Sequence, residues 1–192
     1  GERPLAKMLE ESWIQMEMKK SDPNTGETKD AYIWATGNGL ARNKSAAQMQ
    51  AAVEAALPFD AGVFAAAVAD WRVATESSSK IKKKNGKMPV LEFAENPDIL
   101  AQVSQMKDGR PALIVGFAAE TDDVIVNATA KRKRKGCDWI VANDVSPETG
   151  IMGGNENDVM LISADGSEDW PRMGKGAVAE RLALKMVEAL AG

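Results

Sequence analysis

Residues 63–84 read VFAAAVADWRVATESSSKIKKK, and this stretch decides the fold. Val63–Val68 is an unbroken apolar run of strand length, and Asp70 and Arg72 follow it on either side of Trp71. In an open α/β sheet, ligands bind outside the carboxyl ends of the strands, so these polar groups mark a candidate site. A buried strand with a solvated end explains the stretch about as well when it is taken alone.

The composition favours a globular chain with one core. The sequence has 192 residues, 44% of them apolar, so we expect a single domain over residues 1–192. The formal net charge of −4 argues against a dedicated nucleic-acid partner. The sequence contains no apolar run of the roughly 18 residues that a membrane span needs, and its N-terminus has no signal-peptide pattern. We therefore expect a cytoplasmic protein with no membrane partner.

The scarcity of cysteine and histidine excludes several kinds of chemistry. Cys137 is the only cysteine, so it forms no internal disulfide and is expected to be a buried thiol. Histidine is absent, which excludes histidine acid–base catalysis and makes a zinc site untenable. A metal ion would have to be Mg²⁺ carried on a phosphate ligand, and no metal-binding residue is predicted.

Helices and strands alternate from Ser45 onward. Ser45 is a good N-cap for the helix AAQMQAAVEAAL, which ends before Pro58, and the apolar run 63–68 follows it. Further strands are predicted at 112–117 (ALIVGF), 137–142 (CDWIVA) and 157–162. This order is typical of a doubly wound α/β sheet, with the three motif-bearing strand ends along one edge. A closing helix over 176–190 is expected to bury Val178, Leu182, Met186 and Leu190.

The first 44 residues give weaker patterns. Leu5–Met18 has helical spacing of apolar residues and predicts an amphipathic helix, and residues 21–30 predict a turn. A strand is predicted over Ala31–Ala35. The TGNG that follows is more typical of an ordinary loop than of a phosphate-binding loop.

Two basic segments suggest an anion site. Residues 80–93 (KIKKKNGKMPVLEF) place five lysines around an Asn-Gly turn, which predicts a basic β-hairpin flap. The predicted helix that starts at Thr121 and stops at Gly136 ends in KRKRK, where Lys131 and Lys135 share a face. A polyanion would suit both segments. The alternatives are a solubilising edge strand for the first and complementation of the helix dipole for the second.

The motif NPDIL at 96–100 opens another predicted helix. Asn96 is the expected N-cap, Pro97 the first helical residue, and the helix is expected to end near Asp108–Gly109. The free N–H groups at such a start can bind a ligand, although most helices with this signature are purely structural.

Six motifs in order give a specific resemblance: AAAVADWR, KIKK, NPDIL, GFAAET, a K-x-x-x-K before KGCDWIVANDV, and GGNENDV. Together they resemble bacterial phosphopantothenoylcysteine synthetase, which is usually the C-terminal half of a bifunctional coenzyme A biosynthesis protein. The resemblance covers about residues 45–190.

This resemblance implies an α/β fold with a three-layer, Rossmann-like, mostly parallel sheet and a basic β-hairpin flap. It also implies a homodimer, CTP and Mg²⁺, a possible fused phosphopantothenoylcysteine decarboxylase, and ligation of 4′-phosphopantothenate to L-cysteine through an acyl-cytidylate. Matched by motif, Lys80 is the candidate catalytic residue, and Asn143 and Asp144 are expected to line the site. The implied nucleotide contacts are Phe64, Ala65, Ala66, Asp70, Lys80, Pro97, Asp98, Ile99, Leu100, Phe117, Lys131 and Lys135.

Two family motifs are missing from residues 1–44: a Gly-Pro-Thr phosphate loop and an Asn-x-Ser-Ser-Gly-Lys segment. An alternative to the ligase is therefore a nucleotide-binding dimerisation domain without catalysis. A third reading, an oxidoreductase, is disfavoured because the chain has no G-x-G-x-x-G fingerprint.

Overall fold

The computed structural model describes residues 13–21, 28–36, 45–65, 68–75, 91–146 and 155–191. The first described elements are β1 (Trp13–Ser21) and β2 (Thr28–Thr36), which pair antiparallel. The predicted helix is therefore wrong over residues 13–18, because the apolar residues there also alternate with a period of two, as in a strand. The predicted strand 31–35 is confirmed, and residues 37–39 of TGNG lie outside the described part of the chain.

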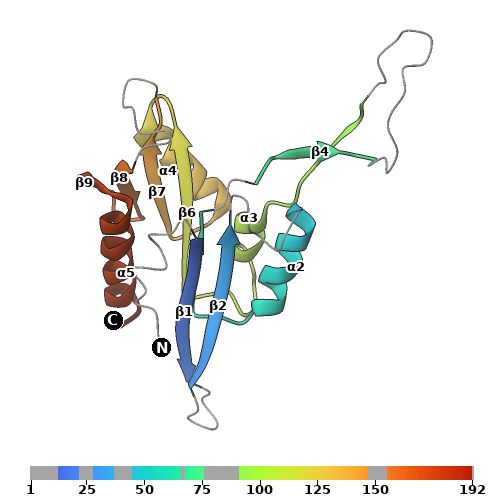
Figure 1. The fold of residues 1–192 in the computed structure, drawn as a ribbon, viewed down its shortest axis with the longest axis horizontal. Helices are drawn as coiled ribbons and strands as arrows, with labels where there is room; N and C mark the ends of the chain where they lie inside the picture. Colours follow the sequence, from blue (N-terminus) through green and yellow to red (C-terminus); the bar gives the residue numbers. More distant parts are fainter. Residues whose placement is uncertain are drawn as a thin grey trace.

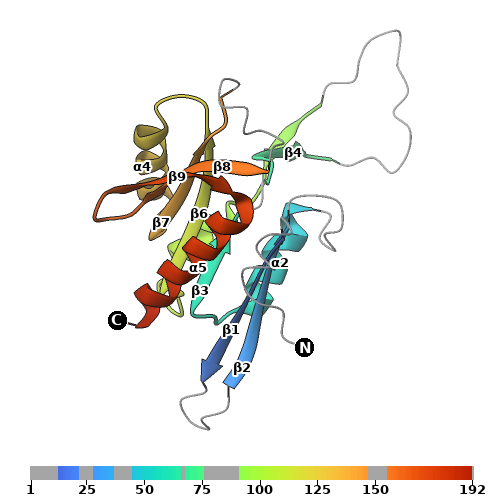
Figure 2. The ribbon, with the colours of Figure 1, turned by 60° about the vertical axis from the view of Figure 1, so that its left-hand side comes forward.

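A mixed sheet forms the centre of the described structure (Figures 1 and 2). Its strands, in spatial order, are β3 (Ala61–Phe64), β6 (Leu113–Glu120), β7 (Trp139–Asp144), β8 (Glu156–Ile162) and β9 (Ser167–Gly174). β3, β6 and β7 pair in parallel, and β8 pairs antiparallel with both β7 and β9. The predicted α/β class is confirmed, with the three motif-bearing strands side by side.

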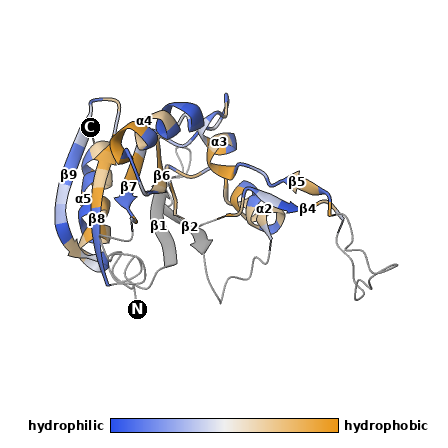
Figure 3. Cartoon of the chain, turned by 90° about the horizontal axis from the view of Figure 1, so that it is seen from above, coloured by the Kyte–Doolittle hydropathy of each residue, from blue (hydrophilic) through white to orange (hydrophobic). Residues whose placement is uncertain are grey.

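One strand of this sheet has other bounds than expected, and another strand was not predicted. β3 starts two residues before Val63 and ends at Phe64, because its pairing with β6 stops there. β9 was not predicted, since its sequence SEDWPRMG has little apolar character and contains Pro171. An edge strand tolerates such a sequence, and β9 is mostly hydrophilic in Figure 3.

Helices cover both faces of the sheet, which gives the predicted three layers. α2 (Ala46–Ala56), α3 (Ile99–Ser104) and α4 (Val124–Lys135) pack on one face, and α5 (Lys175–Ala191) packs on the other. Val178, Leu182 and Met186 are buried as predicted, whereas Leu190 is 36% exposed and that prediction is wrong. Among the described residues, no helix has the length and apolar character to cross a membrane.

The helix starts were predicted with mixed success. Ser45 caps α2 as expected, and its side chain accepts a hydrogen bond from the Gln48 N–H. α3 is capped by Asp98 and not by Asn96, and it already ends at Ser104. α4 begins after Asp123, whose backbone is left-handed, so Thr121 is not its cap. In each corrected case the local pattern had placed the start at least two residues too early.

A second, two-stranded sheet lies between β3 and α3 in the chain and stands apart from the central sheet (Figure 1). In it, β4 (Trp71–Val73) and β5 (Phe93–Glu95) pair antiparallel and form the base of a hairpin. This pairing was not predicted, and residues 80–90 of the predicted β-hairpin flap lie outside the described part of the chain, so the flap stays a prediction. The five lysines of the flap, Lys80 among them, lie outside the described residues.

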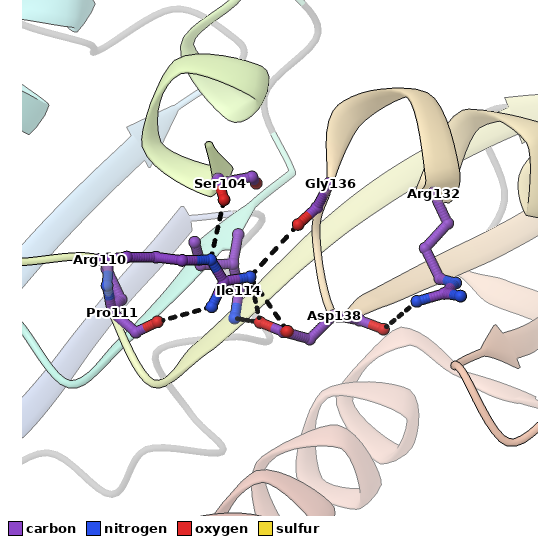
Figure 4. A network of polar contacts seen from close by, with 7 residues as sticks. All are labelled: Ser104, Arg110, Pro111, Ile114, Arg132, Gly136 and Asp138. Carbon is purple, nitrogen blue, oxygen red and sulfur yellow. Dashed lines mark hydrogen bonds and ion pairs between the residues drawn. The ribbon is translucent and has the colours of Figure 1, made fainter. Parts of the chain in front are cut away.

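A polar network joins the N-terminal end of β6 to β7 and α4 (Figure 4). Asp138 accepts a hydrogen bond from the Ile114 N–H at 2.7 Å and pairs with Arg110 at 2.9 Å. The Arg110 guanidinium also donates to the carbonyls of Ser104, Pro111 and Gly136. One ion pair therefore ties the ends of α3 and α4 to the sheet.

We expect Asp138→Ala to lower the free energy of unfolding by about 1.5–3 kcal/mol, the range for hydrogen bonds to charged groups, because the Ile114 N–H and the Arg110 guanidinium lose their acceptor. Urea unfolding followed by circular dichroism measures this. Asp108→Ala, at an exposed position, is the control and should change stability by about 0.5 kcal/mol or less. Equal effects of the two substitutions would contradict a structural role for the network.

Cys137 is buried as predicted, with 3% of its surface exposed. Burial raises the pKa of its thiol to about 11. Since the thiolate is the reactive form, we expect iodoacetamide to leave Cys137 unmodified at pH 8 in the folded protein and to label it in urea. Rapid labelling of the folded protein, measured by intact mass, would show that the thiol is accessible.

Candidate functional site

A cavity of about 260 Å³ lies at the carboxyl ends of β3 and β6. Its walls come from α2, the end of β3, the base of the hairpin, the start of α3, β6 and the last turns of α4. The residues that line it are Met49, Val53, Phe64, Val68, Ala69, Asp70, Asn96, Pro97, Asp98, Ile99, Leu100, Phe117, Lys131, Arg134 and Lys135. This is the sheet edge at which open α/β folds bind ligands.

Most of the site residues predicted from the sequence line this one cavity: Phe64, Asp70, Pro97, Asp98, Ile99, Leu100, Phe117, Lys131 and Lys135. They come from five places in the chain: the end of β3, the base of the hairpin, the start of α3, β6 and α4. Their roles in binding remain predictions.

The other predicted residues lie elsewhere. Ala65 follows β3 but is not part of the cavity wall, and Ala66 and Lys80 lie outside the described residues. Asn143 and Asp144 end β7 on the same edge of the sheet, and they do not line the cavity either. Hydrogen bonds from the Ser146 side chain and from the Ser146 N–H instead hold the pKa of the Asp144 carboxyl below its ordinary value.

The sequence prediction missed several wall residues. Met49 and Val53 are four apart on α2, so the apolar stripe of that helix could have indicated them. Arg134 stands next to Lys135 and three residues after Lys131, which places it near their face of the helix. Val68, Ala69 and Asn96 lie within motifs that the sequence analysis singled out, but no binding role was predicted for them.

The wall combines an apolar side with a cationic side. Met49, Val53, Phe64 and Leu100 are apolar, and α4 contributes the three cations Lys131, Arg134 and Lys135. Asp70 and Asp98 supply carboxylates. Such a wall suits a ligand with a flat or apolar part joined to an anionic part.

Asp98 and Lys135 form an ion pair across the cavity wall. Asp98 also caps α3 by accepting a hydrogen bond from the Ala101 N–H at 3.1 Å. Burial disfavours its charged form, but the bonds from Lys135 and Ala101 and the nearby cationic charge hold the pKa of this carboxyl below its ordinary 3.8. The start of α3 is therefore fixed to the last turn of α4.

The end of α3 is held to the same turn of α4. The Gln105 side chain donates to the carbonyl oxygens of Arg134 and Lys135 at 3.2 and 3.3 Å. These carbonyls lack partners within the helix, so Gln105 caps the C-terminus of α4 from outside. The left-handed Gly136, with φ of 78°, ends that helix as predicted.

Gly116 of β6 lets α3 approach the sheet closely. A Cβ atom at this position would lie 2.7 Å from a Leu100 methyl carbon and 2.8 Å from an Ile140 methyl carbon. The missing side chain therefore gives Leu100 its place between the sheet and the cavity.

Asn96 closes the base of the hairpin beside the cavity. Its backbone N–H donates to the Asp70 carbonyl at 2.8 Å, and its side-chain amide donates to the Ala69 carbonyl at 2.7 Å. The chain thus leaves the cavity wall at Asp70 and returns to it at Asn96, with the hairpin between them.

The described residues contain no group of three or more acidic, cysteine or histidine side chains that could hold a metal ion. Asp70 and Asp98 are the carboxylates of the cavity wall, and Asp98 is engaged by Lys135. A metal ion in this cavity would therefore depend on oxygen ligands from a bound molecule.

Fold and site together define an α/β protein of the Rossmann-like type with a mixed apolar and cationic ligand cavity. The sequence profile of one family, described as the DNA/pantothenate metabolism flavoprotein C-terminal domain, matches residues 32–190. The chain belongs to this family, which confirms the assignment made from its motifs.

Individual relatives agree with this assignment. The chain is 43% identical over 131 residues to the coenzyme A biosynthesis bifunctional protein CoaBC of Escherichia coli K12, covering 66% of this chain and 32% of that protein. It is 39% identical over 146 residues to a cysteine/cysteine sulfinic acid decarboxylase from an unknown prokaryotic organism, covering 75% and 40%. The chain thus spans less than half the length of these curated relatives.

A solved structure shows the same fold. The crystal structure of the C-terminal domain of a coenzyme A biosynthesis bifunctional protein CoaBC superposes with a TM-score of 0.58 at 28% identity. The match covers 82% of this chain and 74% of that one.

Asp98 gives a direct test of how α3 is held. We expect Asp98→Ala to lower the free energy of unfolding by about 1 kcal/mol, since it removes a helix cap. Asp98→Asn keeps an acceptor for the Ala101 N–H and should lower the free energy of unfolding by less than Asp98→Ala does. Chemical unfolding of the two variants measures the difference, and an Ala variant as stable as wild type would contradict the capping role.

The pH dependence follows from the lowered pKa of Asp98. Because its folded-state pKa lies below the ordinary 3.8, the charged carboxylate stabilises the fold above that pH and this stabilisation is lost as the pH falls below it. The stability gap between wild type and Asp98→Asn should therefore narrow below about pH 3.8. If the stability gap between wild type and Asp98→Asn instead widens as the pH falls, the pKa of Asp98 is not lowered in the folded state.

Proposed function

We propose that this chain catalyses the CTP-dependent ligation of 4′-phosphopantothenate to L-cysteine in coenzyme A biosynthesis. The observation that carries the proposal is the cavity at the ends of β3 and β6, in which most of the motif-matched residues meet beside three cations. Membership of the family and the relatives named CoaBC support the pathway.

In this proposal the nucleotide spans the two kinds of wall. The segment Pro97–Leu100 offers backbone groups beside apolar side chains, which suits selection of the base. Lys131 and Lys135 come from α4 and would attract the phosphates. Lys80 would reach the phosphates from the hairpin, as its motif implies.

The reaction needs charge compensation more than it needs an enzyme nucleophile. A carboxylate oxygen of phosphopantothenate attacks the α-phosphorus of CTP and pyrophosphate leaves, which forms the acyl-cytidylate. The amine of cysteine then attacks the acyl carbon, CMP leaves with the bonding electron pair, and the amine gives up its proton. The first step drives two anions together, so cations around the phosphates lower its barrier. A buried thiol such as Cys137 and the absence of histidine are compatible with this chemistry.

Mg²⁺ fits the cavity only as a companion of the phosphates. Asp70 is the wall carboxylate that Lys135 does not engage, and it is the residue that would hold such an ion together with phosphate oxygens. The ion would neutralise phosphate charge when bound.

The proposed assembly is a homodimer, with a phosphopantothenoylcysteine decarboxylase fused or associated. The relatives are bifunctional proteins longer than this chain, which supports a fused partner. Trp71 and Phe93 at the base of the hairpin are 57% and 62% exposed, and large apolar residues of this kind favour cover by a second subunit.

A second candidate function is nucleotide binding and dimerisation without ligation. It is favoured by the absence of the two family motifs from residues 1–44. Both candidates bind CTP, and they differ in the release of pyrophosphate.

CTP should raise the unfolding temperature of this protein more than ATP does at equal concentration. The physical reason is that a ligand bound only to the folded state adds stability in proportion to its affinity. Differential scanning fluorimetry across a concentration series measures both shifts. Equal protection by the two nucleotides, or by neither, would count against the proposal.

Lys80→Ala should mainly slow the formation of the acyl-cytidylate and weaken CTP binding less. A flap lysine that closes over bound substrate acts most strongly as charge builds on the α-phosphate. Lys80→Arg should restore activity in part, because a guanidinium keeps the charge without the compact geometry of an ammonium.

The measurement is single-turnover release of pyrophosphate at saturating CTP and phosphopantothenate. An unchanged rate with weakened CTP binding would mean that Lys80 only holds the nucleotide. An unchanged rate and unchanged binding would make the flap a basic edge strand.

A further inference from the structure

We propose that Arg134 is a further phosphate-binding residue of the cavity, acting beside Lys131 on the bound nucleotide. The inference rests on the proposed function and adds a residue that the motif comparison does not assign. It follows from how the structure distributes the cations at the end of α4.

The last turn of α4 carries Arg132, Lys133, Arg134 and Lys135. Arg132 is half-buried and turned toward the sheet, where its Nη1 donates to the Asp138 carbonyl at 3.4 Å (Figure 4). Lys133 is exposed and does not line the cavity. Neither residue is in position to meet a ligand there.

Lys135 lines the cavity but is already engaged. It pairs with Asp98, whose lowered pKa keeps the carboxylate charged near neutral pH. The Asp98 carboxylate partly neutralises the charge of Lys135. Lys135 therefore attracts an anionic ligand less strongly than an unpaired lysine at that position would.

Arg134 is the cation of this turn that both lines the cavity and remains available. Its side chain is exposed and makes no ion pair within the described part of the chain, although its charge also acts on Asp98 more weakly than that of Lys135. The Gln105 side chain donates to the Arg134 carbonyl oxygen at 3.2 Å, which anchors the Arg134 backbone. Among the described residues, no hydrogen bond engages the Arg134 guanidinium. A guanidinium offers paired N–H donors that match the oxygens of a phosphate.

The charge of the wall makes this residue important. With Lys135 compensated by Asp98, the described wall retains Lys131 and Arg134 against the carboxylate of Asp70. Lys131 alone would leave this part of the wall close to neutral, which is a poor environment for a triphosphate. Arg134 makes it cationic.

The alternative is that Arg134 only complements the dipole of α4, like any cation at a helix C-terminus. In that case its removal would affect the stability of the helix and leave nucleotide affinity unchanged. Titration calorimetry with CTP separates the two roles when unfolding temperatures are measured without nucleotide.

The experiment compares Arg134→Gln with Lys133→Gln, a neighbouring cation outside the cavity. We expect Arg134→Gln to weaken CTP binding by about tenfold or more, as the loss of a hydrogen bond to a charged group implies, and Lys133→Gln to weaken it less than about twofold. Arg134→Lys should recover part of the loss, since it restores charge without the paired donors. Lys131→Gln is the reference for the proposed phosphate site.

The outcomes distinguish failure of the inference about Arg134 from failure of the proposed function. If Lys131→Gln weakens CTP binding while Arg134→Gln behaves like Lys133→Gln, the inference about Arg134 is overturned and the proposed function stands. If the wild-type protein does not bind CTP, both are overturned. A loss of about tenfold or more for Arg134→Gln that Arg134→Lys partly restores, with unchanged unfolding temperatures, supports the inference.

Discussion

The attachment of α3 to the last turn of α4 is the constraint on which the cavity depends. The Asp98–Lys135 ion pair holds the start of α3, and Gln105 holds its end by donating to two carbonyls of the same turn. Arg110 adds a bond to the Gly136 carbonyl from the sheet side. A helix of six residues has little stability of its own, so these contacts define where it lies. They also keep the segment Pro97–Leu100 at a fixed distance from the cations of α4.

The hairpin is coupled to this arrangement through Asn96. Its two hydrogen bonds to the backbone of Ala69 and Asp70 hold both ends of the hairpin together at the cavity wall. A shift of β4 and β5 would therefore displace residues that line the cavity.

Much of this architecture could be predicted from the sequence, because continuous apolar strands and a Gly-terminated basic helix are local signals. The parallel strands β3, β6 and β7 and the shared face of Lys131 and Lys135 were found in this way. What escaped prediction depends on contacts between distant segments. Asp98 rather than Asn96 caps α3 because the Asn96 amide is drawn to Ala69, and a sequence pattern cannot show that. The pairing of Lys135 with Asp98, and hence the availability of Arg134, is likewise a tertiary property.

The central claim is that this cavity supports ligation and does more than hold a nucleotide. The most direct measurement is CMP formation by the purified protein with CTP, 4′-phosphopantothenate and L-cysteine, each omitted in turn. The account predicts that CMP appears only when all three are present and in equal amount to the ligated product. Tight CTP binding without any CMP formation would contradict it and leave a nucleotide-binding domain without ligase activity.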